Sequence, residues 1–230
     1  MGCRKLTAVT IPQGVTELGA AAFLSCSGLK SVTFLCDLET LGDHTFRYCS
    51  ALESVVLPSG LKAIGVGAFS NCSSMESIHL PDSLLDIGID AFNGCIALAE
   101  ITLPQGLTSI GQAAFYECKS LTEMVIPDSV TTLSTRAFEY CTNLEKVTIL
   151  GGVTVIKQYT FDSCYALKSI TIPQSVKTLE YGILYNCGKL TEIRYLGNTT
   201  QWYDIDKKSG WANSTGKFKV YCADGSELIK

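Results

Sequence analysis

Hydrophobic residues recur along this chain with a period of 23 residues, and one cysteine marks the same place in each period. Each unit reads Cys-x-x-Leu-x-x-Val/Ile-x-Ile/Leu-Pro-x-x-Val/Leu-x-x-Ile/Leu-Gly-x-x-Ala-Phe-x-x. The nine in-phase cysteines are Cys3, Cys26, Cys49, Cys72, Cys95, Cys118, Cys141, Cys164 and Cys187. Self-similarity at a fixed period of about 20 to 50 residues is typical of solenoids, in which each coil packs only on its neighbours. The pattern therefore predicts one elongated domain of stacked coils.

The unit that begins at Cys95 contains every predicted element of a coil. Ile101 and Leu103 flank Thr102, the alternation expected of a strand with one buried face. Pro104 ends this strand because it has no N–H to donate. The chain then turns and returns along the opposite wall, and we expect a tight bend at a glycine followed by a helical turn. These later positions are Leu107, Ile110, Gly111, Ala114 and Phe115.

A single coil cannot fold alone. Its inward side chains, about seven in each unit, contribute roughly 1.5 to 3 kcal/mol apiece when buried. Ordering the backbone costs about 1 to 2 kcal/mol for every residue. Stacking of successive coils is therefore obligatory.

The repeat resembles the 23-residue class of leucine-rich repeat found in BspA-like surface proteins. Both halves of that motif, Cys-x-x-Leu-x-x-Ile-x-Ile-Pro and Ile-Gly-x-x-Ala-Phe, are present, and the match covers residues 3 to about 196. The resemblance implies an α/β leucine-rich-repeat solenoid of about nine repeats, with a curved parallel sheet on one face and short helical or irregular turns on the other. It also implies a secreted or cell-surface protein with a role in recognition or adhesion rather than catalysis.

The period ends near Leu196, so we expect a solenoid over residues 3–196 and a C-terminal cap over residues 197–230. The tail holds Trp202, Tyr203, Trp211, Phe218 and Tyr221. Solenoid ends need a cover, and we place Trp202 in the buried Ile column of the last coil. Residues 217–222 alternate like an edge strand. An aromatic platform for carbohydrate is the alternative interpretation of these rings.

The chain opens inside a repeat, with Met1 and Gly2 directly before Cys3. We expect a natural protein that continues upstream, so the lack of a signal sequence says nothing about compartment. The first coil should lack a proper cap, which predicts end-to-end pairing of two copies as a homodimer.

Equivalent residues of adjacent coils lie about 4.8 Å apart with parallel Cα–Cβ bonds, a poor geometry for a disulfide. The in-phase cysteines should therefore be free, buried thiols. Cys36 and Cys222 fall outside the period. We interpret both as incidental residues of a turn or cap, with a surface thiol as the alternative.

Composition excludes several functions. The net charge is −4 without a basic cluster, which argues against nucleic acid as a partner. No apolar run approaches the roughly 18 residues of a membrane helix, so we expect no membrane insertion. His44 and His79 are the only histidines, and the glycines follow the repeat rather than a phosphate loop. We predict no catalytic residue, metal or cofactor.

Only outward positions are free to carry specificity. On the predicted strand face, the Thr and Val column is explained by strand propensity and cross-strand pairing. The column of Ser and Glu residues is less well explained, because neither residue favours strands. The candidate patch for binding a partner consists of Ser77, His79, Glu100, Thr102 and Glu123.

A second candidate is a row of tyrosines beside the cysteine turn. Tyrosine offers a large contact area with a polar tip and is enriched in protein interfaces. Simple lateral packing over neighbouring coils is the alternative. The row consists of Tyr48, Tyr116, Tyr140, Tyr165 and Tyr185.

Two functions fit these features. The first is a non-catalytic module that recognises a protein or glycan ligand through the solenoid face. The alternative is a rigid spacer that holds another domain of a larger surface protein away from the cell.

Overall fold

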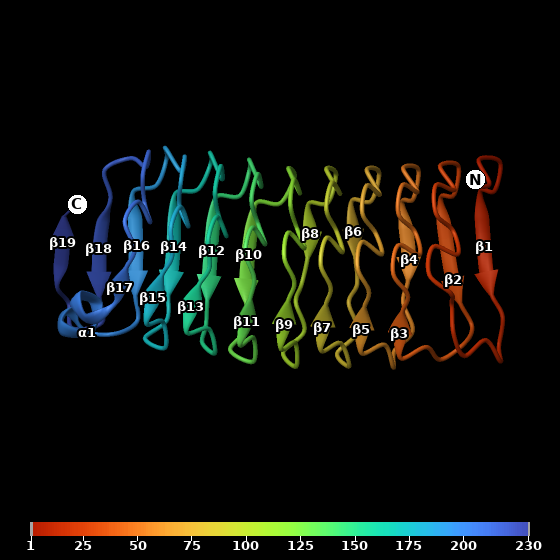
Figure 1. The fold of residues 1–230 in the computed structure, drawn as a ribbon, viewed down its shortest axis with the longest axis horizontal. Coiled ribbons are helices and arrows are strands. Elements are labelled where there is room, and N and C mark those ends of the chain that lie inside the picture. The colour runs from red at the N-terminus through yellow and green to blue at the C-terminus, as the bar shows by residue number, and fades with distance from the viewer. Residues whose placement is uncertain (1, 230) are drawn as a thin grey trace.

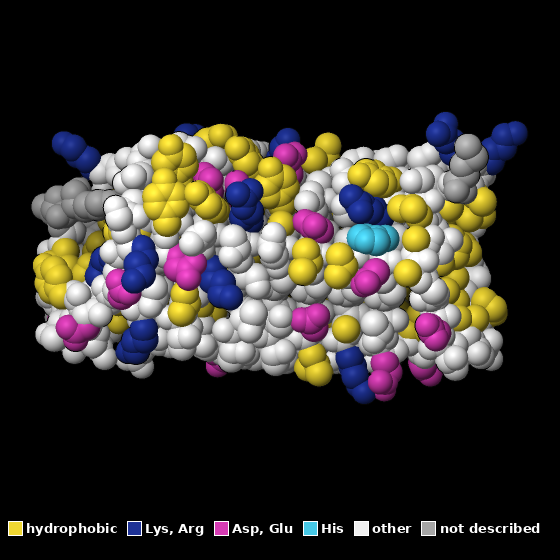
Figure 2. Space-filling model, viewed as in Figure 1, with side chains coloured by type: hydrophobic (Ala, Val, Ile, Leu, Met, Phe, Trp, Pro, Cys, Tyr) yellow, Lys and Arg dark blue, Asp and Glu magenta, His cyan; other side chains and the backbone are white. Residues whose placement is uncertain are grey.

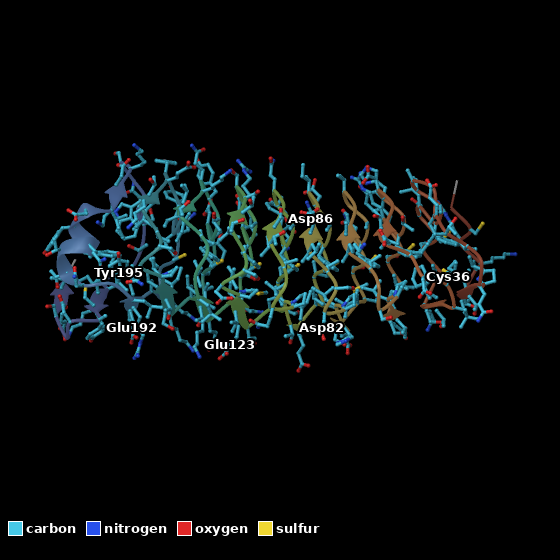
Figure 3. All side chains as sticks on the ribbon, turned by 90° about the horizontal axis from the view of Figure 1, so that it is seen from below. Cys36, Asp82, Asp86, Glu123, Glu192 and Tyr195 are labelled. Atoms are coloured by element: carbon cyan, nitrogen blue, oxygen red, sulfur yellow. The ribbon has the colours of Figure 1, made fainter. Side chains whose placement is uncertain are left out.

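The structure, a computed structural model, describes residues 2–229 and is a solenoid of parallel coils. The coils stack side by side in a nearly straight rod rather than in a pronounced arc, as Figures 1 and 3 show. Each coil has three walls, two made of short strands and one made of turns. The predicted leucine-rich-repeat solenoid is confirmed, although the turns are not helical.

The first wall carries the longer strands, paired in parallel with every residue beside its equivalent 23 positions later. Glu123 lies beside Lys146, for example, and Met124 beside Val147. The strands are β1 (Ala8–Ile11), β2 (Ser31–Phe34), β4 (Ser54–Val56), β6 (Ser77–Ile78), β8 (Glu100–Ile101), β10 (Glu123–Ile126), β12 (Lys146–Ile149), β14 (Ser169–Ile172) and β16 (Glu192–Tyr195).

The second wall consists of two-residue strands that follow the proline turn. They form one sheet from β3 to β11 and a separate one from β13 to β17. The strands are β3 (Thr40–Leu41), β5 (Ala63–Ile64), β7 (Asp86–Ile87), β9 (Ser109–Ile110), β11 (Thr132–Leu133), β13 (Val155–Ile156), β15 (Thr178–Leu179) and β17 (Asp206–Lys207).

The third wall is a chain of tight turns where a helical turn was expected. Ala113 and Glu117 have φ values of 53° and 57°, in the left-handed region that interrupts a helix. The N–H groups of Ala113, Phe115 and Glu117 donate to carbonyls of the next coil at 3.1, 2.8 and 2.9 Å. The same two positions of each coil are left-handed throughout the wall. Hydrogen bonds between coils therefore replace the hydrogen bonds within a helix.

Gly111 lies where the chain passes from β9 into the turns of the third wall, and close packing also favours glycine there. A Cβ atom at this position would lie 2.6 Å from the backbone of Gly88, its equivalent in the preceding coil. Later coils have Ser134, Lys157 and Glu180 in this column.

The core is built from columns of identical side chains that pass from coil to coil. Phe46, Phe69, Phe92, Phe115 and Phe138 are fully buried. Their rings stack, with centroids of successive rings between 5.1 and 5.5 Å apart. Offset stacking at this distance is a favoured arrangement of aromatic rings.

The in-phase cysteines act as hydrogen-bond donors inside this core. The Sγ atom of Cys95 lies 3.1 Å from the carbonyl oxygen of Phe69, and that of Cys118 lies 3.3 Å from that of Phe92. All eleven thiols are free, and Cys26 to Cys187 are buried as predicted. Cys3 is exposed, contrary to the prediction, because no coil covers its outer side in the described structure. Cys36 and Cys222 are buried, so the surface-thiol alternative is wrong.

The first coil is the least covered. Phe23, Leu18 and Leu6 are only partly buried, whereas Phe46, Leu41 and Leu29, their equivalents in the second coil, are completely or almost completely inaccessible. A hollow of about 860 Å³ lies at this end, lined by Leu6, Leu24 and Cys26 among others. The end-to-end homodimer expected from this exposed coil stays a prediction.

The C-terminal segment continues the stack as one more, altered coil. Helix α1 (Thr199–Asp204) begins at Asn198, whose Oδ1 accepts from the Gln201 N–H at 2.9 Å in a capping box. Strand β18 (Lys219–Cys222) pairs with both β16 and β19 (Glu227–Ile229), so it is not the edge strand that was predicted. Trp202 is buried, but it lies in α1, and Lys207 of β17 occupies the position beside Leu179. The helix inserts extra residues and shifts the register.

Two buried carboxylic acids interrupt the third wall. Glu139 and Asp162 occupy the same column in consecutive coils and are 5% and 7% exposed. Burial raises the pKa of Glu139, with Arg136 opposing and Asp162 adding to the increase. Burial also raises the pKa of Asp162, and the hydrogen bond from Ser163 opposes this. Within residues 2–229 the Glu139 Oε2 atom has no hydrogen bond, and its one ion-pair contact is Arg136 Nη1 at 3.4 Å.

We expect a single fast-reacting thiol in the folded protein. Burial raises the pKa of Cys95 and Cys187 to about 12, so these groups stay protonated and shielded, while Cys3 is accessible. A chromogenic disulfide reagent at pH 8 should label one thiol rapidly and all eleven after denaturation. The Cys3→Ser variant is the control and should remove the rapid phase; a fast phase of two or more thiols would contradict the buried column.

Glu139→Gln should stabilise the protein at neutral pH. A carboxylic acid whose pKa is raised by folding favours the folded state when protonated, and this advantage is lost as the pH rises through the folded pKa. We expect a gain of about 1 kcal/mol at pH 7, shrinking toward zero near pH 4, measured by urea unfolding. Glu145→Gln, in an exposed pair with Lys168, is the control and should change stability by less than about 0.5 kcal/mol. A destabilised Glu139→Gln protein at pH 7 would contradict the unfavourable burial.

Candidate binding surfaces

The structure brings the five residues of the strand-face patch onto one exposed surface of the first wall. Ser77, Glu100 and Glu123 lie in one outward column at the starts of β6, β8 and β10. His79 and Thr102 follow β6 and β8 and are also exposed. In Figure 3 Glu123 lies at the surface of the rod, whereas Tyr195 lies inside it. Alternation along the strand places all five outside because their neighbours fill the core.

Two shallow crevices lie within this patch. The first, of about 210 Å³, is lined by Ser77, His79, Glu100 and Thr102 over Ile78 and Ile101. The second, of about 230 Å³, is lined by Thr102, Gln105, Glu123 and Val125 over Ile101 and Leu103. Sequence reasoning missed Gln105 and Val125. Val125 belongs to the outward column of Thr and Val residues, which was attributed to strand propensity. That column could have indicated its exposed position.

Charges on the first wall are mixed. Glu53 pairs with Lys30 at 3.3 Å, and Glu145 pairs with Lys168 at 2.6 Å, each across one coil spacing. Figure 2 shows acidic and basic side chains interspersed over the visible face, without a broad area of one sign. Long-range steering of a highly charged polymer is therefore not a property of this face.

The predicted tyrosine row is only partly assembled. Tyr116 and Tyr140 meet edge to face on the third wall, with ring centroids 5.6 Å apart. Burial raises the pKa of Tyr116, and the carboxylates of Glu117 and Glu139 add to the increase. Tyr165 is 47% exposed and lies just after Cys164. Tyr48 lies three coils away from Tyr116, beside the Arg47 guanidinium at 5.0 Å.

A neighbouring group on the third wall was missed. The rings of Tyr159 and Tyr181 meet edge to face at 5.6 Å, and the Arg136 guanidinium lies 5.2 Å from the centre of the Tyr159 ring. Arginine over an aromatic face is a favourable cation–π contact. The search for tyrosines beside the cysteines could not find this group, because it lies at the opposite end of the turns, around the left-handed residues Arg136, Tyr159 and Gly182.

The C-terminal rings pack against one another and line a hollow of about 560 Å³. Trp202 and Phe218 are 5% and 2% exposed, and Tyr203 is 67% exposed. The Lys207 Nζ atom lies 4.6 Å from the Trp202 ring and donates to the carbonyls of Trp202 and Ile205. Burial lowers the pKa of this lysine, and Asp204 opposes that effect. The alternative of a carbohydrate platform would have to use accessible rings such as that of Tyr203.

Within residues 2–229, His, Cys, Asp and Glu side chains form no group of three or more that could hold a metal ion. Over the same residues, the helical part of the chain offers no apolar stretch of the length needed to cross a bilayer.

Comparisons with known proteins identify relatives with the same architecture. A leucine-rich-repeat protein from T. pallidum is 28% identical, with a TM-score of 0.56 over 81% of this chain and 78% of that one. The pneumococcal vaccine antigen PcpA is 17% identical, with a TM-score of 0.59 over 92% of this chain and 68% of that one, and this likeness concerns the fold alone. No curated protein matches the chain.

The 23-residue unit itself matches a known family description. Residues 1–99 and 85–205 match the BspA type leucine-rich-repeat region, in six copies. These ranges span most of the chain and include the coils that carry both candidate surfaces. The protein therefore belongs to the BspA-type leucine-rich-repeat family.

Proposed function

We propose that this protein is a non-catalytic recognition module that binds a partner through the first wall. The observation that carries the proposal is the exposed patch around β8, with two crevices inside an otherwise regular wall. The core uses nearly every inward position for packing, so the outward columns can vary without cost to the fold. An extended repetitive face is well suited to many weak contacts with one partner.

Membership in the family supports a binding or adhesion role in general terms. We propose here the kind of partner and the place of action. Membership in the BspA-type family favours a secreted or cell-surface protein. The partner is a protein or a glycan outside the cell. A spacer function requires only the continuous core, and it would leave the surface around β8 without a role.

The Thr102→Arg variant tests the proposal. Thr102 lines both crevices, so a large charged side chain there should block contact while leaving the core unchanged. The purified chain is screened against immobilised extracellular matrix proteins and glycans. We expect Thr102→Arg to weaken every specific interaction by at least about tenfold, which is about 1.4 kcal/mol.

Gln112→Arg is the matched control, because Gln112 is exposed and follows Gly111 at the start of the third wall. It adds the same charge far from the patch and should bind as the unmodified chain does. Equal loss in both variants, or no loss in either, would reject the first wall as the binding surface. A chain that binds nothing in the screen would favour the spacer.

A further inference from the structure

The first wall is not one continuous sheet. The strand pairing stops between β4 and β6 and again between β8 and β10, which leaves β6 and β8 as a separate pair. On the second wall, the sheet from β3 to β11 continues through the same coils. The coils are therefore in contact throughout, and only the first wall opens at these two places.

Beside the gap between β8 and β10, the buried face of the wall is more accessible. Ile101 is partly exposed, whereas the equivalent Ile78 and Met124 are 6% and 2% exposed. Ile101 forms part of the floor of both crevices, one on each side of β8. Each crevice has an aliphatic floor and one carboxylate at its rim, from Glu100 in the first and from Glu123 in the second.

The Glu100 and Glu123 carboxylates differ from Glu53 and Glu145 in how closely a lysine neutralises their charge. Glu53 and Glu145 have lysine partners at 3.3 and 2.6 Å. Glu123 has Lys146 only at 3.8 Å, and within residues 2–229 no cation lies within ion-pair distance of Glu100. Glu76, which precedes β6, also has no ion pair within residues 2–229, but it lines neither crevice. Glu100 and Glu123 combine a missing or long ion pair with a place at a crevice rim. A cationic group from outside the chain would meet little competition there.

The lining indicates which cation fits. Lysine and arginine bury an aliphatic stem while the charged head stays at a polar rim, which matches an aliphatic floor beside a carboxylate. Arginine can also bind a carboxylate with two parallel hydrogen bonds. The crevice linings contain no aromatic ring on which a sugar could stack. The chemistry favours a polypeptide over a glycan.

We propose that the two crevices beside β8 bind Lys or Arg side chains from an extended segment of a partner protein. The inference rests on the proposed recognition function and narrows its partner to a basic polypeptide segment. Neighbouring crevices would take two side chains that project from the same side of that segment, which alternate residues of an extended chain do. The Glu100 and Glu123 carboxylates then receive the cationic heads.

A fluorescein-labelled peptide of alternating arginine and serine is the probe, and its binding is followed by fluorescence anisotropy at low and at about 0.15 M ionic strength. The Glu100→Gln/Glu123→Gln variant keeps the size of both side chains and removes their charge. We expect its affinity for the peptide to fall at least about tenfold, or about 1.4 kcal/mol. Circular dichroism should show the same thermal transition as in the unmodified chain.

The control is Glu53→Gln/Glu145→Gln, which removes the same number of charges from the same wall where lysine partners are already present. It should change affinity by less than about threefold at 0.15 M ionic strength. Equal loss in the two double variants would reduce the interaction to general charge attraction and overturn the proposal. Failure of the unmodified chain to bind the peptide would overturn it as well.

The Thr102→Arg screen separates this inference from the proposed function. A partner that is lost in Thr102→Arg but bound normally by Glu100→Gln/Glu123→Gln would leave the first wall as the recognition surface and reject basic side chains as its ligands. A partner unaffected by either variant would reject both.

Discussion

The structure depends on the stacking of each coil on an equivalent coil, with every residue beside its counterpart 23 positions away. A single coil has neither enough apolar surface nor enough internal hydrogen bonds to offset the loss of backbone entropy. Stacking supplies both, because the three walls exchange hydrogen bonds between coils while the Phe, Leu and Ile columns exclude water. The thiols follow the same constraint. Equivalent cysteines are parallel rather than facing, so those from Cys49 to Cys187 donate to a phenylalanine carbonyl of the coil before, as Cys95 does to Phe69.

The constraint separates packing from recognition. Inward columns are nearly uniform because any change in volume is felt by both neighbouring coils. Outward columns have no such restriction, and on the first wall they range from Ser77 through Glu100 to Lys146. One crevice lies over the β6–β8 pair and the other over the gap between β8 and β10, and both add relief to this part of the wall. Binding specificity can therefore reside in a few residues around β8 while the second and third walls keep the coils together.

The same separation explains why the two candidate surfaces differ in character. The first wall is a sheet whose side chains alternate between core and solvent, so its patch was predictable once the strand was located. The third wall is a series of turns in which buried and exposed positions depend on left-handed residues such as Ala113 and Glu117. Glu139 and Asp162 are buried there, Arg136 lies beside Glu139, and the rings of Tyr159 and Tyr181 meet across adjacent coils. These contacts arise from backbone geometry rather than from sequence spacing.

The period of the sequence by itself determined the solenoid, the inward columns, the free, buried in-phase cysteines from Cys26 to Cys187 and the outward position of Ser77, His79, Glu100, Thr102 and Glu123. Periodicity is sufficient for these features because identical units can bury identical residues only by stacking in register. Only the tertiary structure decided that the turns of the third wall are not helical, that α1 shifts the last coil and moves Trp202 out of its expected column, and that the first wall opens beside β8. Those features depend on backbone conformations and on the fit between neighbouring coils, which units with the same hydrophobic pattern do not distinguish.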